Sequence, residues 1–274
     1  MKPMYQVFIA EDEPAALQHL CNIIRIKCQN FQVVGTAENG QEALEQLESF
    51  HPDILITDVK MPVMDGIMLA KRVKERYPDL LTVIISGYQD FSYAQSALRF
   101  GVCDYILKPV KPSVLQESLR ILKGRLDEYY YKMRNRIIHE MCAGNFTENP
   151  GFQQIFPEEE YYTALLRKNS LPRRFLESQG VEFFSGMEEQ MIVYGRDEME
   201  TLYICPKKLL FHNSFYQVVQ NLLEKEKKTK TMSFYTLILT EKPVSAKELF
   251  PTIRRLIYIL DHRLFIGKNQ TIEI

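Results

Sequence analysis

Acidic, hydroxyl and basic side chains follow short apolar runs at several points in the first 110 residues. These side chains belong to Glu11, Asp12, Asp58, Ser86 and Lys108. Crowded carboxylates repel one another unless a cation offsets them, and all-oxygen ligation with retained water suits Mg²⁺. A nearby ammonium group and a hydroxyl group can hold the oxygens of a phosphoryl group. The residue types therefore predict phosphoryl transfer to Asp58, with a metal offsetting the developing charge.

The apolar runs are expected to form the strands of one parallel sheet. The run before Asp58 has no helical spacing, as in a strand that is buried on both faces. We predict strands at 7–10, 31–36, 54–57, 80–85 and 104–107, alternating with helices at 14–24, 40–47, 68–76 and 91–100. Five strands that alternate with helices predict a five-stranded doubly wound parallel sheet of the α/β class, with helices on both faces. The carboxyl ends of the strands then share one edge, where the polar side chains meet.

Asp58 taken alone has a simpler interpretation. Aspartate is common in turns, so a strand-ending aspartate can simply begin one. What favours a shared site is that several strands of the same sheet end in polar side chains of complementary types.

The composition limits the number of domains and the kinds of partner and site that this chain can have. A chain of 274 residues with ordinary apolar content can form two domains. Its 34 basic and 35 acidic side chains give no global reason to expect nucleic acid as a partner of this segment. The five cysteines are scattered and contain no Cys-x-x-Cys pair, which argues against a disulfide framework or a zinc site and favours the cytoplasm. No run approaches the roughly 20 apolar residues that span a bilayer, so no membrane partner is expected.

Residues 1–125 resemble the receiver domain of two-component response regulators, which has a flavodoxin-like fold. The motifs that carry the resemblance are Glu11-Asp12-Glu13-Pro14, Asp58–Gly66, Ser86-Gly87-Tyr88 and Tyr105-Ile106-Leu107-Lys108-Pro109. The resemblance implies that Asp58 is the phosphoacceptor and that a sensor histidine kinase donates the phosphoryl group.

The same resemblance assigns roles around Asp58. It implies that Mg²⁺ is held by Asp12, by Glu11, by Asp58 itself and by the backbone carbonyl of Lys60. Glu11 is a mild departure, because the family often has aspartate there. Lys108 would contact the phosphoryl group. Ser86 would be the switch hydroxyl, and Tyr105 the aromatic side chain that turns inward when Ser86 moves.

A long helix is predicted over 112–145, beginning as the last receiver helix and continuing as a connector. Its apolar residues are spaced as in a helix seam: Leu115, Leu119, Leu122, Leu126, Tyr129 and Met133. The first half is expected to pack on the receiver sheet. Beyond Leu122 the sheet should run out, so we expect a second partner, most simply the same helix of another subunit. Residues 115–133 are therefore predicted to mediate a short homodimeric coiled coil, weakened by Gly124.

Residues 155–274 are predicted to form a smaller α+β domain. Strands are expected at 161–166 and 234–239, a hairpin at 191–204, and helices at 211–226 and 249–260. The stretches Ser86–Ala94 and Ile257–Lys268 resemble response regulators of the AraC-type, YesN-like group, whose middle domain is a degenerate cyclase. In Gly186-Met187-Glu188-Glu189-Gln190, Met187 and Gln190 depart from the nucleotide-binding turn of true cyclases, which implies that cyclase activity is lost.

Proteins of that group usually continue into two helix-turn-helix motifs. The sequence ends at Ile274 without them, so we expect either a longer regulator that controls DNA through a domain absent from this chain or a regulator without such a domain. The leading hypothesis is a non-enzymatic, phosphorylation-switched transcriptional regulator.

Two other classes stay open. A phosphohydrolase of the haloacid-dehalogenase type would need a second acid two residues after Asp58, where Lys60 stands. A nucleotide cyclase or nucleotide sensor would need a better phosphate-binding turn than Gly186–Gln190.

Overall fold

The computed structural model describes residues 4–87, 99–147, 150–168, 191–195, 199–210, 214–229, 234–263 and 267–274. The chain divides into two compact units, Lys2–Tyr129 and Tyr130–Ile274. Three stretches used in the sequence predictions lie mostly or wholly outside the described residues. They are the helix at 91–100, the stretch Ser86–Ala94 and the motif Gly186–Gln190.

The first unit contains a five-stranded parallel sheet with the order β2-β1-β3-β4-β5. The strands are β1 (Tyr5–Ala10), β2 (Phe31–Ala37), β3 (Ile54–Asp58), β4 (Leu81–Ser86) and β5 (Asp104–Leu107). All five residues of β3 are buried, as expected for a central strand covered on both faces. The predicted α/β fold of this unit is confirmed.

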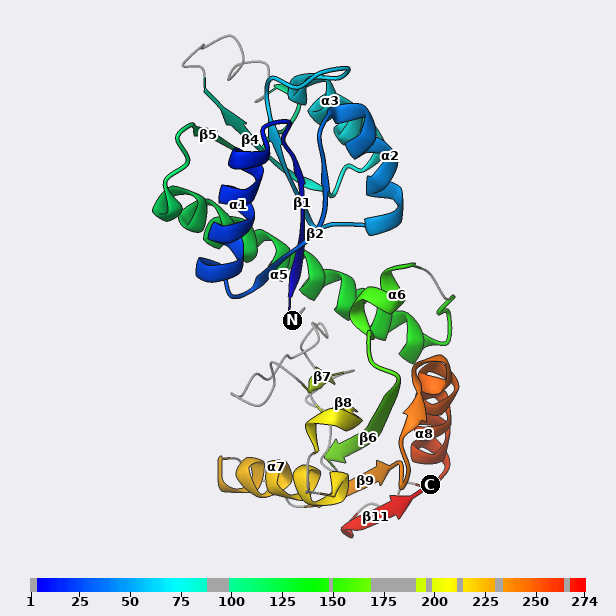
Figure 1. The fold of residues 1–274 in the computed structure, drawn as a ribbon. Coiled ribbons are helices and arrows are strands. Elements are labelled where there is room, and N and C mark those ends of the chain that lie inside the picture. The colour runs from blue at the N-terminus through cyan, green and yellow to red at the C-terminus, as the bar shows by residue number, and fades with distance from the viewer. Residues whose placement is uncertain are drawn as a thin grey trace. The chain divides into compact units, whose positions relative to one another are not determined.

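Helices cover both faces of this sheet. Figure 1 shows α1 and α5 on one side and α2 and α3 on the other. Their bounds are α1 (Pro14–Lys27), α2 (Gly40–Phe50), α3 (Gly66–Arg76) and α5 (Pro112–Ala143). α3 begins two residues earlier than predicted, because the Asp65 side chain accepts a hydrogen bond from Met68 N and caps the helix.

The leucine stripe of α5 is covered within the chain. Leu115, Leu119, Leu122 and Leu126 are only 0–3% exposed. Farther along, Met133 packs against an apolar cluster of the second unit. The chain itself therefore buries Leu126, whereas Tyr129 of the same predicted stripe is 36% exposed. Dimerisation through 115–133 stays a prediction.

The second unit is built on a mixed sheet, so its α+β class is also confirmed. Its main strand order is β11-β9-β6-β8-β7, and β10 pairs with β6. The strands are β6 (Glu160–Lys168), β7 (Ile192–Gly195), β8 (Glu200–Pro206), β9 (Tyr235–Leu239), β10 (Val244–Ser245) and β11 (Gln270–Glu273). β6 is antiparallel to β8, β9 and β10, and β11 is parallel to β9.

Helices and short turns complete the second unit. They are α6 (Pro150–Ile155), α7 (Phe215–Thr229), α8 (Leu249–Arg263) and the 3₁₀ turns η1 (Lys207–Leu209) and η2 (Ala246–Glu248). The predicted hairpin is present, because β7 and β8 are antiparallel neighbours. β10, β11 and α6 were not predicted.

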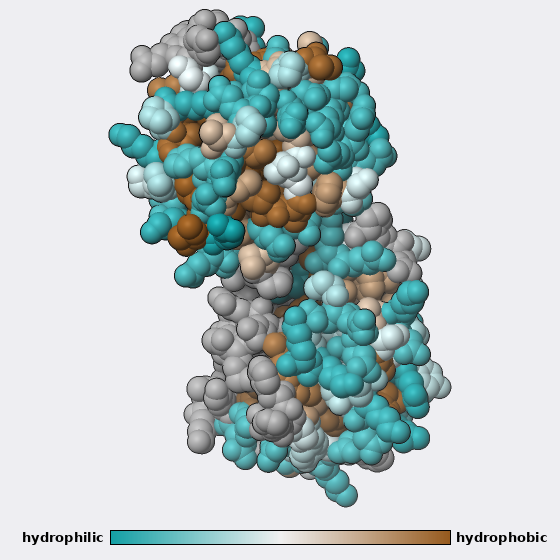
Figure 2. All heavy atoms as spheres, viewed as in Figure 1, coloured by the Kyte–Doolittle hydropathy of each residue, from teal (hydrophilic) through white to brown (hydrophobic). Residues whose placement is uncertain are grey.

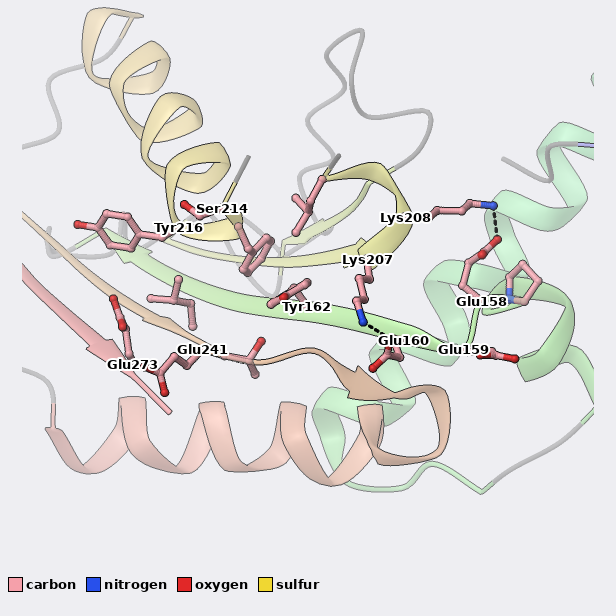
Figure 3. Close-up of a pocket in the computed structure, with 15 residues that line it drawn as sticks. Glu158, Glu159, Glu160, Tyr162, Lys207, Lys208, Ser214, Tyr216, Glu241 and Glu273 are labelled. Atoms are coloured by element: carbon pink, nitrogen blue, oxygen red, sulfur yellow. Dashed lines mark hydrogen bonds and ion pairs between the residues drawn. The ribbon is translucent and has the colours of Figure 1, made fainter. Parts of the chain in front are cut away.

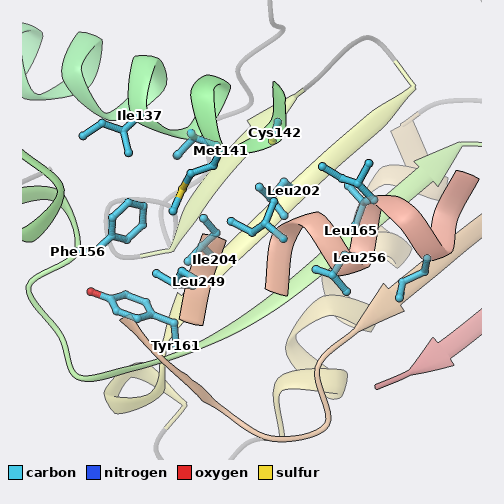
Figure 4. Packing of buried hydrophobic residues seen from close by; sticks show 14 of the residues in the cluster. Ile137, Met141, Cys142, Phe156, Tyr161, Leu165, Leu202, Ile204, Leu249 and Leu256 are labelled. Carbon is cyan, nitrogen blue, oxygen red and sulfur yellow. The ribbon is translucent and has the colours of Figure 1, made fainter. Parts of the chain in front are cut away.

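Each face of the second sheet has its own apolar core. Leu202 and Ile204 of β8 belong to one cluster, and Tyr203 and Cys205, which alternate with them, belong to the other. Figure 4 shows the first cluster, where Met141 of α5 lies near residues of β8 and α8. α7 contributes Phe215, Val219 and Leu223 to the second cluster.

Hydrophilic residues dominate the face of each unit that Figure 2 shows, with apolar residues in small groups between them. Among the described residues, no helix combines the length and the apolar character that a membrane span requires.

Candidate functional site

Three carboxylates meet at the carboxyl edge of the first sheet. Glu11 and Asp12 directly follow β1, and Asp58 is the last residue of β3. β1 and β3 are parallel neighbours, so their carboxyl ends lie side by side. One carboxylate oxygen from each residue lies within 4.8 Å of the other two. The acids that the sequence predicted to converge are therefore in one cluster.

Lys108 brings a positive charge to this cluster from the loop after β5. Its Nζ lies 2.9 Å from Glu11 Oε1 and 2.8 Å from Asp58 Oδ2. The Lys108 side chain is 21% exposed, while those of Glu11 and Asp58 are 0% and 9% exposed. A single ammonium group thus bridges two buried carboxylates.

Burial controls the electrostatics of Glu11. Removal from water raises the pKa of Glu11, and the charge of Asp58 raises it further, while the hydrogen bond from Lys108 opposes both. Burial lowers the pKa of Lys108, but its bonds to Asp58 and Glu11 outweigh burial and leave that pKa raised. Glu11 Oε2 is buried and has no hydrogen-bond partner among the described residues. This oxygen is an available acceptor for a cation.

The backbone around Asp58 fixes the direction of its side chain. Asp58 Oδ1 accepts a hydrogen bond of 2.7 Å from Val59 N, and the Asp58 carbonyl oxygen accepts one of 3.0 Å from Thr57 Oγ1. Gly66 lies against the same carbonyl: a Cβ built there would be 1.9 Å from Asp58 O. The contact between Gly66 and Asp58 was not predicted from the sequence, although the Asp65-Gly66 pair before a helix indicates a close backbone approach.

Ser86 is the last residue of β4 and is completely buried. Its carbonyl oxygen accepts a hydrogen bond of 2.7 Å from Lys108 N, which places it beside the loop that carries Lys108. Tyr105 lies within β5 and is partly buried against the cluster of Val59, Ala70, Ile84 and Val102. Lys60 follows Val59 and is exposed. Ser86 therefore lies at the edge of the sheet, while Tyr105 packs below it.

The donor set fits Mg²⁺. Three carboxylates within 4.8 Å provide oxygen ligands, and the buried Glu11 Oε2 lacks a protein donor among the described residues. Asp12 is the most accessible of the three acids, which leaves room for the waters that Mg²⁺ retains.

A separate groove of about 910 Å³ lies in the second unit between the start of α7 and the ends of β9 and β11 (Figure 3). The charges along one end are already paired, because Lys207 and Lys208 each lie 2.5 Å from a carboxylate oxygen, of Glu160 and Glu158 respectively. None of the described residues that line it is a histidine or a cysteine. The described lining therefore offers no set of groups for nucleophilic catalysis.

Comparison with known proteins supports the interpretation of the first unit. Residues 7–120 match the family model described as the response regulator receiver domain. The transcriptional regulatory protein YesN of Bacillus subtilis (strain 168) is 31% identical over 163 residues, which are 60% of this chain and 42% of that protein. The transcriptional regulatory protein DegU of Brevibacillus brevis is 27% identical over 80% of this chain and 86% of its own length.

A solved structure is also similar to the first unit. The REC domain of AraT, a response regulator from Geobacillus stearothermophilus, is 39% identical and matches 46% of this chain and 98% of that structure, with a TM-score of 0.44. The chain spans less than half the length of the first curated relatives that it matches. The family model and the site geometry agree: the stretch that matches the response regulator receiver domain, residues 7–120, contains Glu11, Asp12, Asp58 and Lys108.

Proposed function

We propose that this chain is the phosphorylation-controlled part of a two-component response regulator, in which Asp58 accepts a phosphoryl group from a sensor histidine kinase. The observation that carries the proposal is the cluster of Glu11, Asp12, Asp58 and Lys108 around one sheet edge. Such a cluster supplies a carboxylate nucleophile, oxygen ligands for a metal and a cation for phosphoryl oxygens.

The site residues then have distinct roles. Glu11, Asp12, Asp58 and the Lys60 carbonyl hold Mg²⁺, which neutralises charge on the incoming phosphoryl group. An Asp58 oxygen bonds to phosphorus as the bond to the donor nitrogen breaks. Lys108 lies within hydrogen-bond distance of Asp58 and contacts the phosphoryl oxygens after transfer.

Ser86 and Tyr105 form the switch in this proposal. The phosphoryl group brings roughly two negative charges and three acceptor oxygens, which draw the Ser86 hydroxyl toward it. Movement of Ser86 leaves space for Tyr105, whose ring is only partly buried. The surface formed by β5 and α5 then changes, and partners can read the change.

The output of the whole protein is transcription control in the cytoplasm. Support comes from the similar proteins, which are named as transcriptional or response regulatory proteins. We propose a receiver domain over 1–125, a receiver helix and connector over 112–145 and a middle domain over 155–274. Dimerisation through 115–133 belongs to the proposal, with exposed Tyr129 rather than the buried leucines as the contact residue of that stretch.

We propose that the second unit is a degenerate cyclase-like middle domain of the AraC-type, YesN-like group. The mixed sheet of the second unit, with β7 and β8 as antiparallel neighbours, supports this. Met187 and Gln190 in Gly186–Gln190 depart from the nucleotide-binding turn of true cyclases, so cyclase activity is expected to be lost.

Phosphohydrolase activity is the weaker candidate, because Lys60 stands where a second acid would be needed. We propose that the receiver is not an enzyme beyond slow loss of its own phosphoryl group.

The test is phosphorylation by a small donor. Incubation with Mg²⁺ and acetyl phosphate is expected to add one phosphoryl group per chain, detected by intact-protein mass spectrometry. Asp58→Asn is expected to abolish it. Asp65→Asn is the matched control, because asparagine also caps a helix and Asp65 lies in the same loop outside the cluster.

Two results would contradict the proposal. One is an adduct that persists in Asp58→Asn. The other is sustained hydrolysis of excess acetyl phosphate, which would identify a phosphohydrolase instead.

A further inference from the structure

The turn of α5 around Gly124 is weaker than its surroundings. Gly124 is exposed in the interior of a 32-residue helix, and a Cβ added there would meet nothing within 4 Å. Close packing therefore does not require a glycine at this position. Glycine lowers helix stability relative to alanine by about 1 kcal/mol, which corresponds to about a fivefold change in local opening.

Two side chains bracket this weak turn. Lys123 Nζ lies 2.7 Å from Asp127 Oδ2, so the ion pair spans Gly124. Both side chains are about three-quarters covered, at 27% and 26% exposure, so solvent screens the pair less than it screens an exposed one. Lysine before an acid is the less favourable order for a helical pair. The pair stabilises the turn all the same, because its two side chains lie on either side of Gly124.

A third residue fixes the pair to the sheet. Tyr5 at the start of β1 is completely buried, and its hydroxyl donates a hydrogen bond of 2.5 Å to Asp127 Oδ1. Asp127 thus has one carboxylate oxygen bonded to its own helix and the other bonded to β1. The ring of Tyr5 also packs against Phe31 of β2, with centroids 5.8 Å apart. Tyr5 is therefore a rigid anchor.

We propose that Tyr5, Asp127 and Lys123 form a latch that keeps the weak turn of α5 around Gly124 helical. Release of the latch then opens the helix at Gly124. The latch lies within the first unit, three residues before Tyr130, where the second unit begins. α5 supplies residues to both units. The latch therefore controls whether α5 is continuous at the point where it leaves the receiver.

Hydrogen exchange of the full 274-residue chain tests the latch. Tyr5→Phe keeps the buried ring and removes the hydroxyl, and it is expected to speed exchange of amides 124–130 about tenfold. Gly124→Ala is expected to slow exchange of the same amides about fivefold, since the new methyl group meets no neighbour. In the double variant the two changes are expected to offset each other.

Tyr77→Phe is the matched control. The Tyr77 hydroxyl is also buried in the first unit, but it has no hydrogen-bond partner among the described residues. Its removal is expected to leave exchange of 124–130 within twofold of wild type.

Two outcomes would overturn the latch. In the first, Tyr5→Phe accelerates exchange evenly across β1, β3 and α5, which would make the hydroxyl a general stabiliser of the unit. In the second, Gly124→Ala leaves the exchange of 124–130 unchanged, which would show that the turn is not weak.

Discussion

The two units place their charged side chains in opposite ways. In the first, Glu11, Asp58 and Lys108 come from three parallel strands whose carboxyl ends lie at one edge. In the second, β6 runs antiparallel to β8 and β9, so neighbouring strands end at opposite edges. Its ion pairs stay separate, as in Arg167 with Glu200 on adjacent strands. Parallel strands concentrate unlike charges into one site, whereas antiparallel strands distribute them as structural pairs.

The largest predicted effect concerns the backbone under the concentrated site. Gly66→Ala places a Cβ 1.9 Å from the Asp58 carbonyl oxygen. The backbone must move, and we expect a loss of about 3 kcal/mol in the stability of the first unit. Urea titration read by hydrogen exchange separates this unit from the second. Gly124→Ala is the control, with a small gain expected. Equal losses in both variants would contradict the reasoning.

The next effect compares a buried ammonium group with an exposed one. Lys108→Met leaves Glu11 and Asp58 without their bridge, and we expect a loss of about 2 kcal/mol at pH 7. Added Mg²⁺ is expected to restore most of the loss, because it binds the folded cluster. Lys207→Met removes the Lys207–Glu160 pair, whose side chains are 53% and 43% exposed, and no measurable change is expected. Unfolding titrations with and without Mg²⁺ provide the measurement.

A third effect is the pH dependence of the metal-free cluster. Burial raises the pKa of Glu11, so the folded state holds its proton to higher pH than the unfolded state does. Stability of the first unit is therefore expected to fall as pH rises from the ordinary glutamate value through the raised one. The slope from one group is at most about 1.4 kcal/mol per pH unit. Glu11→Gln is expected to flatten the slope, and an unchanged slope would assign it elsewhere.

The smallest losses of stability are expected on removal of one helix cap in each unit, and the two losses are expected to be equal. Asp65→Ala removes the cap of α3, and Ser245→Ala removes the capping box with Glu248 before α8. Each loss is local and amounts to about 1 kcal/mol. Denaturant unfolding of each unit checks this. A much larger loss for Asp65→Ala would mean that the cap also supports the Asp58 cluster.

Sequence patterns predicted the first unit well for a physical reason. Each strand of a covered parallel sheet is a continuous apolar run, and β1, β3 and β4 are buried almost throughout. The polar residue after each run then marks the edge. What the patterns could not predict was the close contact of Gly66 with Asp58, because it depends on the path of the loop between β3 and α3.

The second unit shows where pattern reading fails. β11 has the sequence Gln-Thr-Ile-Glu, whose residues are partly or fully exposed, and only its pairing with β9 makes it a strand. The buried leucine stripe of α5 was predicted, but the cover that the chain itself provides for Leu126 was not, because this burial and the packing of Met133 are set by tertiary contacts. Periodicity identifies a buried face, but it does not identify what buries that face.

The Lys108 bridge also has a consequence for synthesis on the ribosome. Glu11 emerges first, Asp58 follows, and the ammonium that joins them lies 97 residues after Glu11 in the chain. A nascent chain that ends before β5 therefore exposes its acids without their counter-ion and without the last strand of the sheet. The charge cluster is therefore completed only after the loop that follows β5 has been translated, which makes the last strand of the sheet the step that assembles the site.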